Sequence, residues 1–178
     1  MPETGLQGAT TLFIRRWGEM AAGWGISRTM AEIHALLYLA PEPLCMDDVM
    51  DRLEVSRGSA STNLRELVNW GLIRRVHHRG DRKEYFDAEK DVWAMFETIT
   101  RERKRRELQP IVETIERCLE MIDEEGKAKA DAGVKLTRQR LTSMTDFCES
   151  MNGLFNLVVK AGRIGLKPLG LKLAKLVG

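Results

Sequence analysis

The sequence predicts a mainly α-helical protein that carries one small β-hairpin. Ser27 and Ser56 each precede a segment whose apolar residues recur at helical spacing, as helix-capping residues do. Residues 72–77 and 84–87 are partly alternating and partly β-branched, and they flank a charged turn, which is typical of a hairpin. Apolar residues spaced three and four apart after residue 107 predict long helices that pack lengthwise on partners.

Capping and breaking residues divide the first half of the chain. The expected helices are 11–22 started by Thr10 or Thr11, 28–39 capped by Ser27, a short helix from Asp47 or Asp48 to Leu53, and a helix from Ser56 to about Trp70 that Gly71 stops. Pro41 and Pro43 separate the second helix from the third, because proline and the residue before it disfavour helix. Beyond the hairpin we expect helix from Ala88 onward, kinked or restarted at Pro110.

Charge is distributed unevenly along the chain. The net charge is only +2, but residues 56–83 carry seven basic and two acidic side chains, and residues 151–178 carry five basic and no acidic ones. Residues 107–150 carry six basic and ten acidic side chains. A near-neutral total therefore does not argue against a nucleic-acid partner, because one basic block coincides with the fourth helix and the hairpin.

Several classes of protein are not expected. No apolar run is long enough to span a membrane, and the N-terminus lacks a secretion signal. The three scattered cysteines, Cys45, Cys118 and Cys148, fit a reducing cytoplasm better than redox sensing. We expect no metal site, no cofactor and no enzymatic activity, because no ligand cluster, phosphate loop or nucleophile–base pair can be identified.

A short helix, a tight turn, a capped helix and a hairpin, in that order, form a winged helix-turn-helix. The fourth helix has an apolar face for the core and a small, polar face near its N-terminus, suited to a major groove. The charged hairpin tip suits phosphates or a narrow minor groove. The predicted DNA-binding residues are Ser56, Arg57, Gly58, Ser59, Ser61, Thr62, Asn63, Arg65, Arg79, Arg82 and Lys83.

Residues 56–67, 70–73 and 80–86 resemble the GbsR branch of the MarR-type regulators, and the resemblance extends over about residues 27–107. It implies a homodimeric winged-helix transcription factor whose terminal helices form the dimer. It also implies that the wing inserts an arginine into the minor groove, and Asp81-Arg82 is the matching pair. Some members of this branch regulate glycine-betaine synthesis or uptake genes and respond to choline, but no residues of this chain can be matched to that ligand.

Two apolar seams are predicted to hold a homodimer together, with packing inside one chain as the alternative. They consist of Leu108, Val112, Ile115, Leu119 and Ile122, and of Leu141, Met144, Cys148, Met151, Phe155 and Val158. The expected domains are an N-terminal helix over 1–26 that contributes to the dimer, the winged domain over 27–88, a helical dimerisation region over 89–160 and a basic amphipathic tail over 161–178.

Three features leave alternatives open. The aromatic residues Trp17, Trp24, Trp93 and Phe96, with Met20, line an effector pocket in one hypothesis and pack as ordinary core in the other. The basic residues of 101–106 either pair with glutamates on a solvated helix or contact flanking phosphates. We favour packing of the tail across a dimer over its contact with a membrane.

The sequence therefore predicts a cytoplasmic, dimeric, sequence-specific DNA-binding regulator, expected to be a repressor that a small molecule modulates. The rival hypothesis is a winged-helix adaptor that binds proteins or associates with a membrane.

Overall fold

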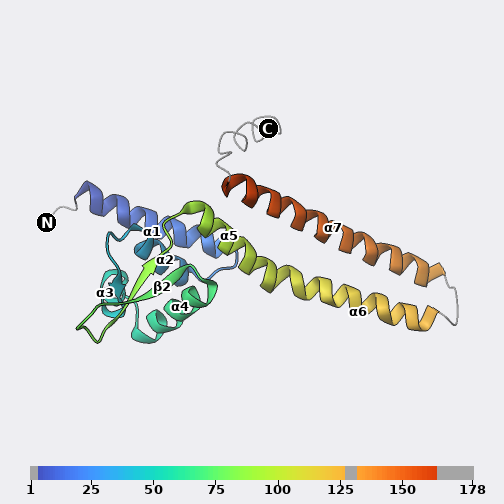
Figure 1. Ribbon diagram of the computed structural model, residues 1–178, viewed down its shortest axis with the longest axis horizontal. Coiled ribbons are helices and arrows are strands. Elements are labelled where there is room, and N and C mark those ends of the chain that lie inside the picture. The colour runs from blue at the N-terminus through green and yellow to red at the C-terminus, as the bar shows by residue number, and fades with distance from the viewer. Residues whose placement is uncertain (1–3, 127–131, 164–178) are drawn as a thin grey trace. The chain divides into compact units, whose positions relative to one another are not determined.

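The computed structural model describes residues 4–126 and 132–163 (Figure 1). The protein is mainly helical with one three-stranded antiparallel sheet, which confirms the predicted fold class. The chain divides into two compact units between Thr98 and Ile99. The predicted tail over 161–178 lies outside the described residues except for its first three positions.

The first unit contains α1 (Gly5–Gly23), α2 (Arg28–Leu39), α3 (Met46–Leu53) and α4 (Arg57–Trp70). Helix α2 is central, because it packs against α1 on one side and against α3, α4 and the sheet on the other (Figure 1). The largest fully buried side chains lie where these elements meet, and they are Ile33, Leu37, Val49, Leu64 and Leu67. Burial of such a side chain stabilises a fold by about 1.5–3 kcal/mol, so this core fixes how α4 is held.

The sheet is formed by β1 (Leu44–Cys45), β2 (Ile73–His77) and β3 (Glu84–Ala88), in the order β1-β3-β2. The hairpin register pairs Ile73 with Ala88 and His77 with Glu84, so the strands and the charged loop lie where they were predicted. The sequence did not reveal β1, which is only two residues long and pairs with the far side of β3.

Local capping explains which helix ends were predicted correctly. Helices α2 and α4 begin after Ser27 and Ser56, whose side chains accept hydrogen bonds from the backbone amides of Met30 and Ser59. Gly71 ends α4 at φ 76°, a left-handed conformation that glycine adopts without strain.

Three predicted helix starts were wrong. Helix α1 begins at Gly5, not near Thr11, because Thr4 and Gln7 form a capping box. Helix α3 begins at Met46, directly after Cys45. The backbone amide of Cys45 donates to the carboxylate of Asp48, which lies in the first turn of the helix. Helix α5 (Val92–Arg103) begins four residues after Ala88, because Ala88 still pairs in β3 and the Asp91 side chain accepts from the amide of Ala94.

The second unit contains the end of α5, a single π-helical turn η1 (Lys104–Leu108), and the helices α6 (Gln109–Gly126) and α7 (Ala132–Arg163). In η1 the amide of Gln109 donates to the carbonyl of Lys104, five residues back. The wide turn directly precedes Pro110, which has no N–H to donate, so the helix restarts as predicted.

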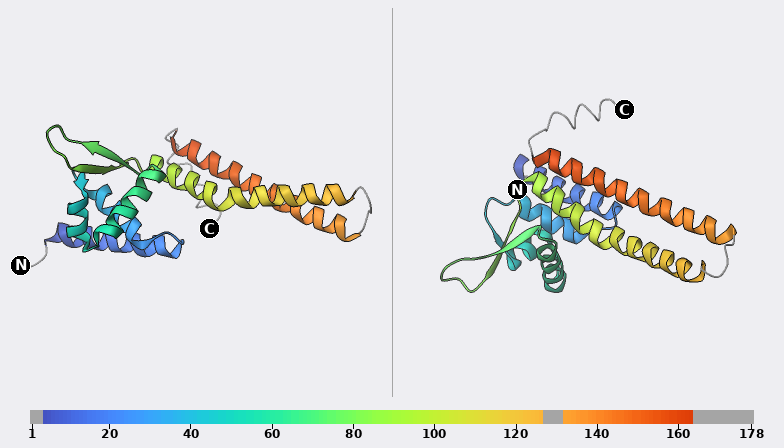
Figure 2. Two further views of the ribbon diagram at one scale, coloured as in Figure 1. Left: turned by 90° about the horizontal axis from the view of Figure 1, so that it is seen from below. Right: turned by 45° about the vertical axis from the view of Figure 1, so that its right-hand side comes forward.

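Helices α6 and α7 run antiparallel as a hairpin and pack on each other (Figure 2). Ile115 and Cys148 are buried in this unit, and both belong to the predicted seams. The α6 seam and part of the α7 seam thus pack within one chain, the alternative that the sequence left open. Met144, Phe155 and Val158 of the α7 seam remain exposed, as do four further apolar residues of α7, which are Leu136, Phe147, Leu154 and Leu157.

His34 is buried in α2, and its Nε2 atom has no hydrogen-bond partner among the residues that the structure describes. Its ring lies 6.4 Å from that of Trp17 and 6.5 Å from that of Tyr38, measured between centroids. Burial, assisted by the nearby charge of Lys90, lowers the pKa of His34 to about 4.

The low pKa of His34 predicts a loss of stability in acid. In the unfolded chain this residue binds a proton below about pH 6.5, whereas in the folded protein it stays neutral down to about pH 4. Between pH 7 and pH 5 the free energy of unfolding should therefore fall by about 2 kcal/mol through His34 alone. Urea unfolding at both pH values should show a correspondingly smaller fall for His34→Leu. An equal fall in both proteins would contradict the assignment.

Candidate nucleic-acid interface

Helix α4 presents its N-terminal half to solvent. Ala60, Leu64 and Leu67 are buried and hold the helix on the core. Among the predicted DNA-binding residues of this segment, Ser56, Arg57, Gly58, Thr62 and Arg65 are exposed, and Ser59 and Ser61 are half-buried. The exposed face is therefore the polar one that the helical spacing predicted.

Asn63 was predicted to bind DNA, but its polar groups form hydrogen bonds within the protein. Its side-chain amide donates to the carbonyl of Ser59 at 2.8 Å, and its Oδ1 atom accepts from the hydroxyl of Ser27 at 3.3 Å. Because Ser27 caps the N-terminus of α2, Asn63 ties α4 to α2. We interpret Asn63 as a residue that positions α4.

The wing is held at its tip by one carboxylate. Asp81 accepts from the backbone amide of Lys83 at 2.9 Å and from the hydroxyl of Tyr85 at 2.7 Å. These hydrogen bonds lower the pKa of Asp81, the amide of Lys83 contributing most, and they raise the pKa of Tyr85. Gly80, which precedes Asp81, has a φ of 89°, a backbone conformation in which a residue with a side chain would be strained. The loop is thus shaped by its own residues, with Arg79 and Arg82 exposed on it.

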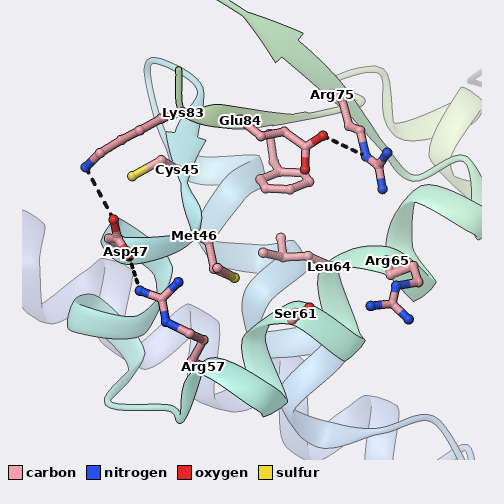
Figure 3. A pocket seen from close by; sticks show the side chains of 11 residues that line it. Cys45, Met46, Asp47, Arg57, Ser61, Leu64, Arg65, Arg75, Lys83 and Glu84 are labelled. Atoms are coloured by element: carbon pink, nitrogen blue, oxygen red, sulfur yellow. Dashed lines mark hydrogen bonds and ion pairs between the residues drawn. The ribbon is translucent and has the colours of Figure 1, made fainter. Parts of the chain in front are cut away.

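A hollow of about 390 Å³ lies between α3, α4 and the hairpin (Figure 3). Four cationic side chains line it, Arg57 and Arg65 from α4 and Arg75 and Lys83 from the hairpin. Two acidic side chains, Asp47 and Glu84, line it as well. Four of the seven basic residues of 56–83 therefore line one concave surface that the helix and wing share.

The acidic residues of the hollow are paired with its cations. Asp47 lies 2.9 Å from Arg57 and 3.3 Å from Lys83, and Glu84 lies 3.2 Å from Arg75. The hydrogen bond to Asp47 is the main cause that raises the pKa of Lys83.

In contrast, Arg65, Arg79 and Arg82 make no ion pair within residues 4–126 and 132–163. Sequence reasoning missed Asp47 and Arg75 at this surface. The strand alternation that puts Arg75 on the same side as Glu84 could have indicated Arg75.

The residues of the predicted effector pocket fall into separate aromatic groups. Trp17 stacks on Phe13 with ring centroids 5.6 Å apart, and Trp93 meets Phe96 edge-on at 6.1 Å. Trp24 is 57% exposed at the end of α1, where Met20 is also exposed. An effector pocket stays a prediction.

The basic stretch over 101–106 is engaged along its own helix. Arg105 and Arg106 both pair with Glu102, and Arg103 pairs with Glu107. The Arg105 hydrogen bond leads the effects that lower the pKa of Glu102 to about 2. These contacts favour the solvated-helix interpretation over contact with flanking phosphates.

Among the residues that the structure describes, no helix has the length and apolar character needed to cross a membrane.

The chain is similar to known transcriptional regulators. The sequence profile of the MarR family matches residues 24–84, which include α2, α3, α4 and most of the hairpin. The chain is 29% identical over 134 residues to the HTH-type transcriptional repressor GbsR of Bacillus subtilis (strain 168), covering 70% of this chain and 74% of that protein. It is 31% identical over 111 residues to the HTH-type transcriptional regulator MmpR5 of Mycobacterium tuberculosis (strain ATCC 25618 / H37Rv), covering 60% of this chain and 67% of that protein.

A solved structure described as a transcriptional regulator shares the fold. It superposes with a TM-score of 0.59 at 24% sequence identity, over 89% of this chain and 99% of that one.

Proposed function

Because the chain belongs to the MarR family of transcriptional regulators, we propose that it represses transcription as a homodimer bound to a pseudo-palindromic operator. The observation that carries the proposal is the shared surface of α4 and the wing. That surface exposes the polar first turns of α4 and three arginines, Arg65, Arg79 and Arg82, that form no ion pair in the described part of the chain. Such a surface can place a helix end in a major groove while the wing contacts the backbone.

The exposed apolar face of α7 supports the homodimer. Leu136, Met144, Phe147, Leu154, Phe155 and Val158 lie within about a third of the helix circumference and are all exposed. Apolar stripes of this size on a regular helix mark protein interfaces. A second copy of the chain presents an identical stripe, so a two-fold interface buries both.

Two further parts of the proposal follow from this one. A small-molecule ligand modulates its binding to DNA, and the candidate contacts for that ligand are Trp17, Met20, Trp24, Trp93 and Phe96. We place the protein in the cytoplasm, where its three free cysteines stay reduced.

Selection of bound duplexes from a random pool tests the proposal directly. The full-length protein should enrich an inverted repeat whose half-sites lie about one helical turn apart. The selected duplex should bind at least about 10³-fold tighter than a scrambled duplex at the same salt concentration. Weak binding that is equal for all sequences would instead support the adaptor hypothesis.

A further inference from the structure

One carboxylate, that of Asp47, lies between the recognition helix and the wing on the surface proposed to meet DNA. Its Oδ1 atom is 2.9 Å from Nη2 of Arg57, and its Oδ2 atom is 3.3 Å from Nζ of Lys83 (Figure 3). Arg57 belongs to the first turn of α4, and Lys83 ends the wing loop. Asp47 itself comes from the first turn of α3, so three elements meet at this group.

The three charged side chains are accessible to solvent. The exposed fractions are 65% for Arg57, 55% for Lys83 and 45% for Asp47. Ion pairs this exposed each change an equilibrium constant by at most about fivefold, so an incoming phosphate can displace them. Asp47 is also not needed to begin α3, because Asp48 provides the hydrogen bond to the Cys45 amide.

We infer that Asp47 sets the DNA affinity of this surface by competing with phosphates for Arg57 and Lys83. The inference rests on the proposed function and deepens it. A phosphate that reaches either cation must compete with Asp47 for its N–H donors and then lies close to a carboxylate. Both effects act on the backbone, which is alike in every sequence, so Asp47 lowers affinity for all duplexes without selecting among them.

Asp47→Asn is the variant that tests this, because it keeps the shape of the side chain and removes its charge. We expect it to bind the selected and the scrambled duplex about three- to tenfold tighter than the wild type at about 50 mM salt, by the same factor for both. The slope of log affinity against log salt concentration should become steeper, because the freed cations release more counterions from DNA.

Asp51→Asn is the matched control. Asp51 lies one turn further along α3, is exposed, and makes no ion pair within the described residues. It removes the same charge without freeing a cation, and we expect a change of less than about twofold. Asp47→Ser removes the Asp47 charge with a residue that suits a helix start, and it serves if the amide variant folds poorly.

The outcomes separate the two proposals. An unchanged or weaker affinity of Asp47→Asn and Asp47→Ser, with wild-type binding intact, overturns the role of Asp47 alone. A loss of affinity confined to one duplex would instead assign Asp47 to a base contact, and it would also overturn the inference that Asp47 competes with phosphates. If the wild-type protein shows no preference for any selected duplex, the proposed function fails and this inference fails with it.

Discussion

Arg65→Ala should reduce the preference of the protein for its selected duplex by about 5- to 150-fold and leave its affinity for scrambled DNA nearly unchanged. Arg65 is exposed on the third turn of α4 and lines the hollow between helix and wing. It makes no ion pair in the described part of the chain, so its guanidinium is available to bind a guanine edge with two hydrogen bonds. Such a contact contributes about 1–3 kcal/mol of discrimination.

Arg82→Ala is the matched control for Arg65→Ala. Arg82 is also exposed and forms no ion pair within the described residues, but it lies on the wing loop. Its loss should weaken binding to selected and scrambled duplexes alike and reduce the salt slope by about 1. Titration of both variants against both duplexes at several salt concentrations distinguishes these roles. A uniform loss for Arg65→Ala would contradict its assignment to base recognition.

The framework of the candidate site could be predicted from the sequence because it is local. Ser56 caps α4, Gly71 ends it, and the apolar spacing between them fixes which face is buried. These signals lie within a few residues of what they determine. The exposed face of the recognition helix follows from them by geometry alone, and the structure bears out its polar character.

The state of the charged residues could not be predicted in the same way. Arg57 and Asp47 are ten residues apart, and Lys83 is 36 residues beyond Asp47, so only the tertiary fold brings the three together. The strand β1 was missed for a similar reason, because its two residues pair with β3 about 40 positions later. Contacts between distant segments leave no periodic signal in a single sequence.

The apolar seams show a different limit. Heptad spacing predicted that α6 and α7 each need a lengthwise partner, and the helices do have one in each other. Spacing does not say whether the partner belongs to the same chain. The exposed apolar face of α7 is rotated from the predicted seam, because it includes Phe147 and Leu154, which the seam lacks, whereas Cys148 of the seam is buried within the chain.

Phe147→Glu combined with Leu154→Glu should convert the protein to a monomer and reduce its affinity for the selected duplex by about 10²- to 10⁴-fold. The two side chains are 61% and 54% exposed, and they lie seven residues apart on the apolar stripe of α7. In a dimer, the first bound half-site holds the second recognition helix at high effective concentration, and that gain is lost in a monomer. Glutamates facing each other across a two-fold axis also repel and resist burial.

Thr142→Glu combined with Asn156→Glu provides the control, because it adds the same charge at exposed positions of α7 away from the stripe. Light scattering should give twice the chain mass of 20.2 kDa for the wild type and the control, and the chain mass itself for the stripe variant. Far-ultraviolet circular dichroism should be the same for all three proteins, since these exposed side chains contribute little to the packing of α6 against α7. A stripe variant that remains dimeric and keeps wild-type affinity would show that a different surface joins the two copies. Loss of the dimer with full affinity retained would mean instead that one chain reads the operator alone, because effective concentration would then contribute nothing to binding.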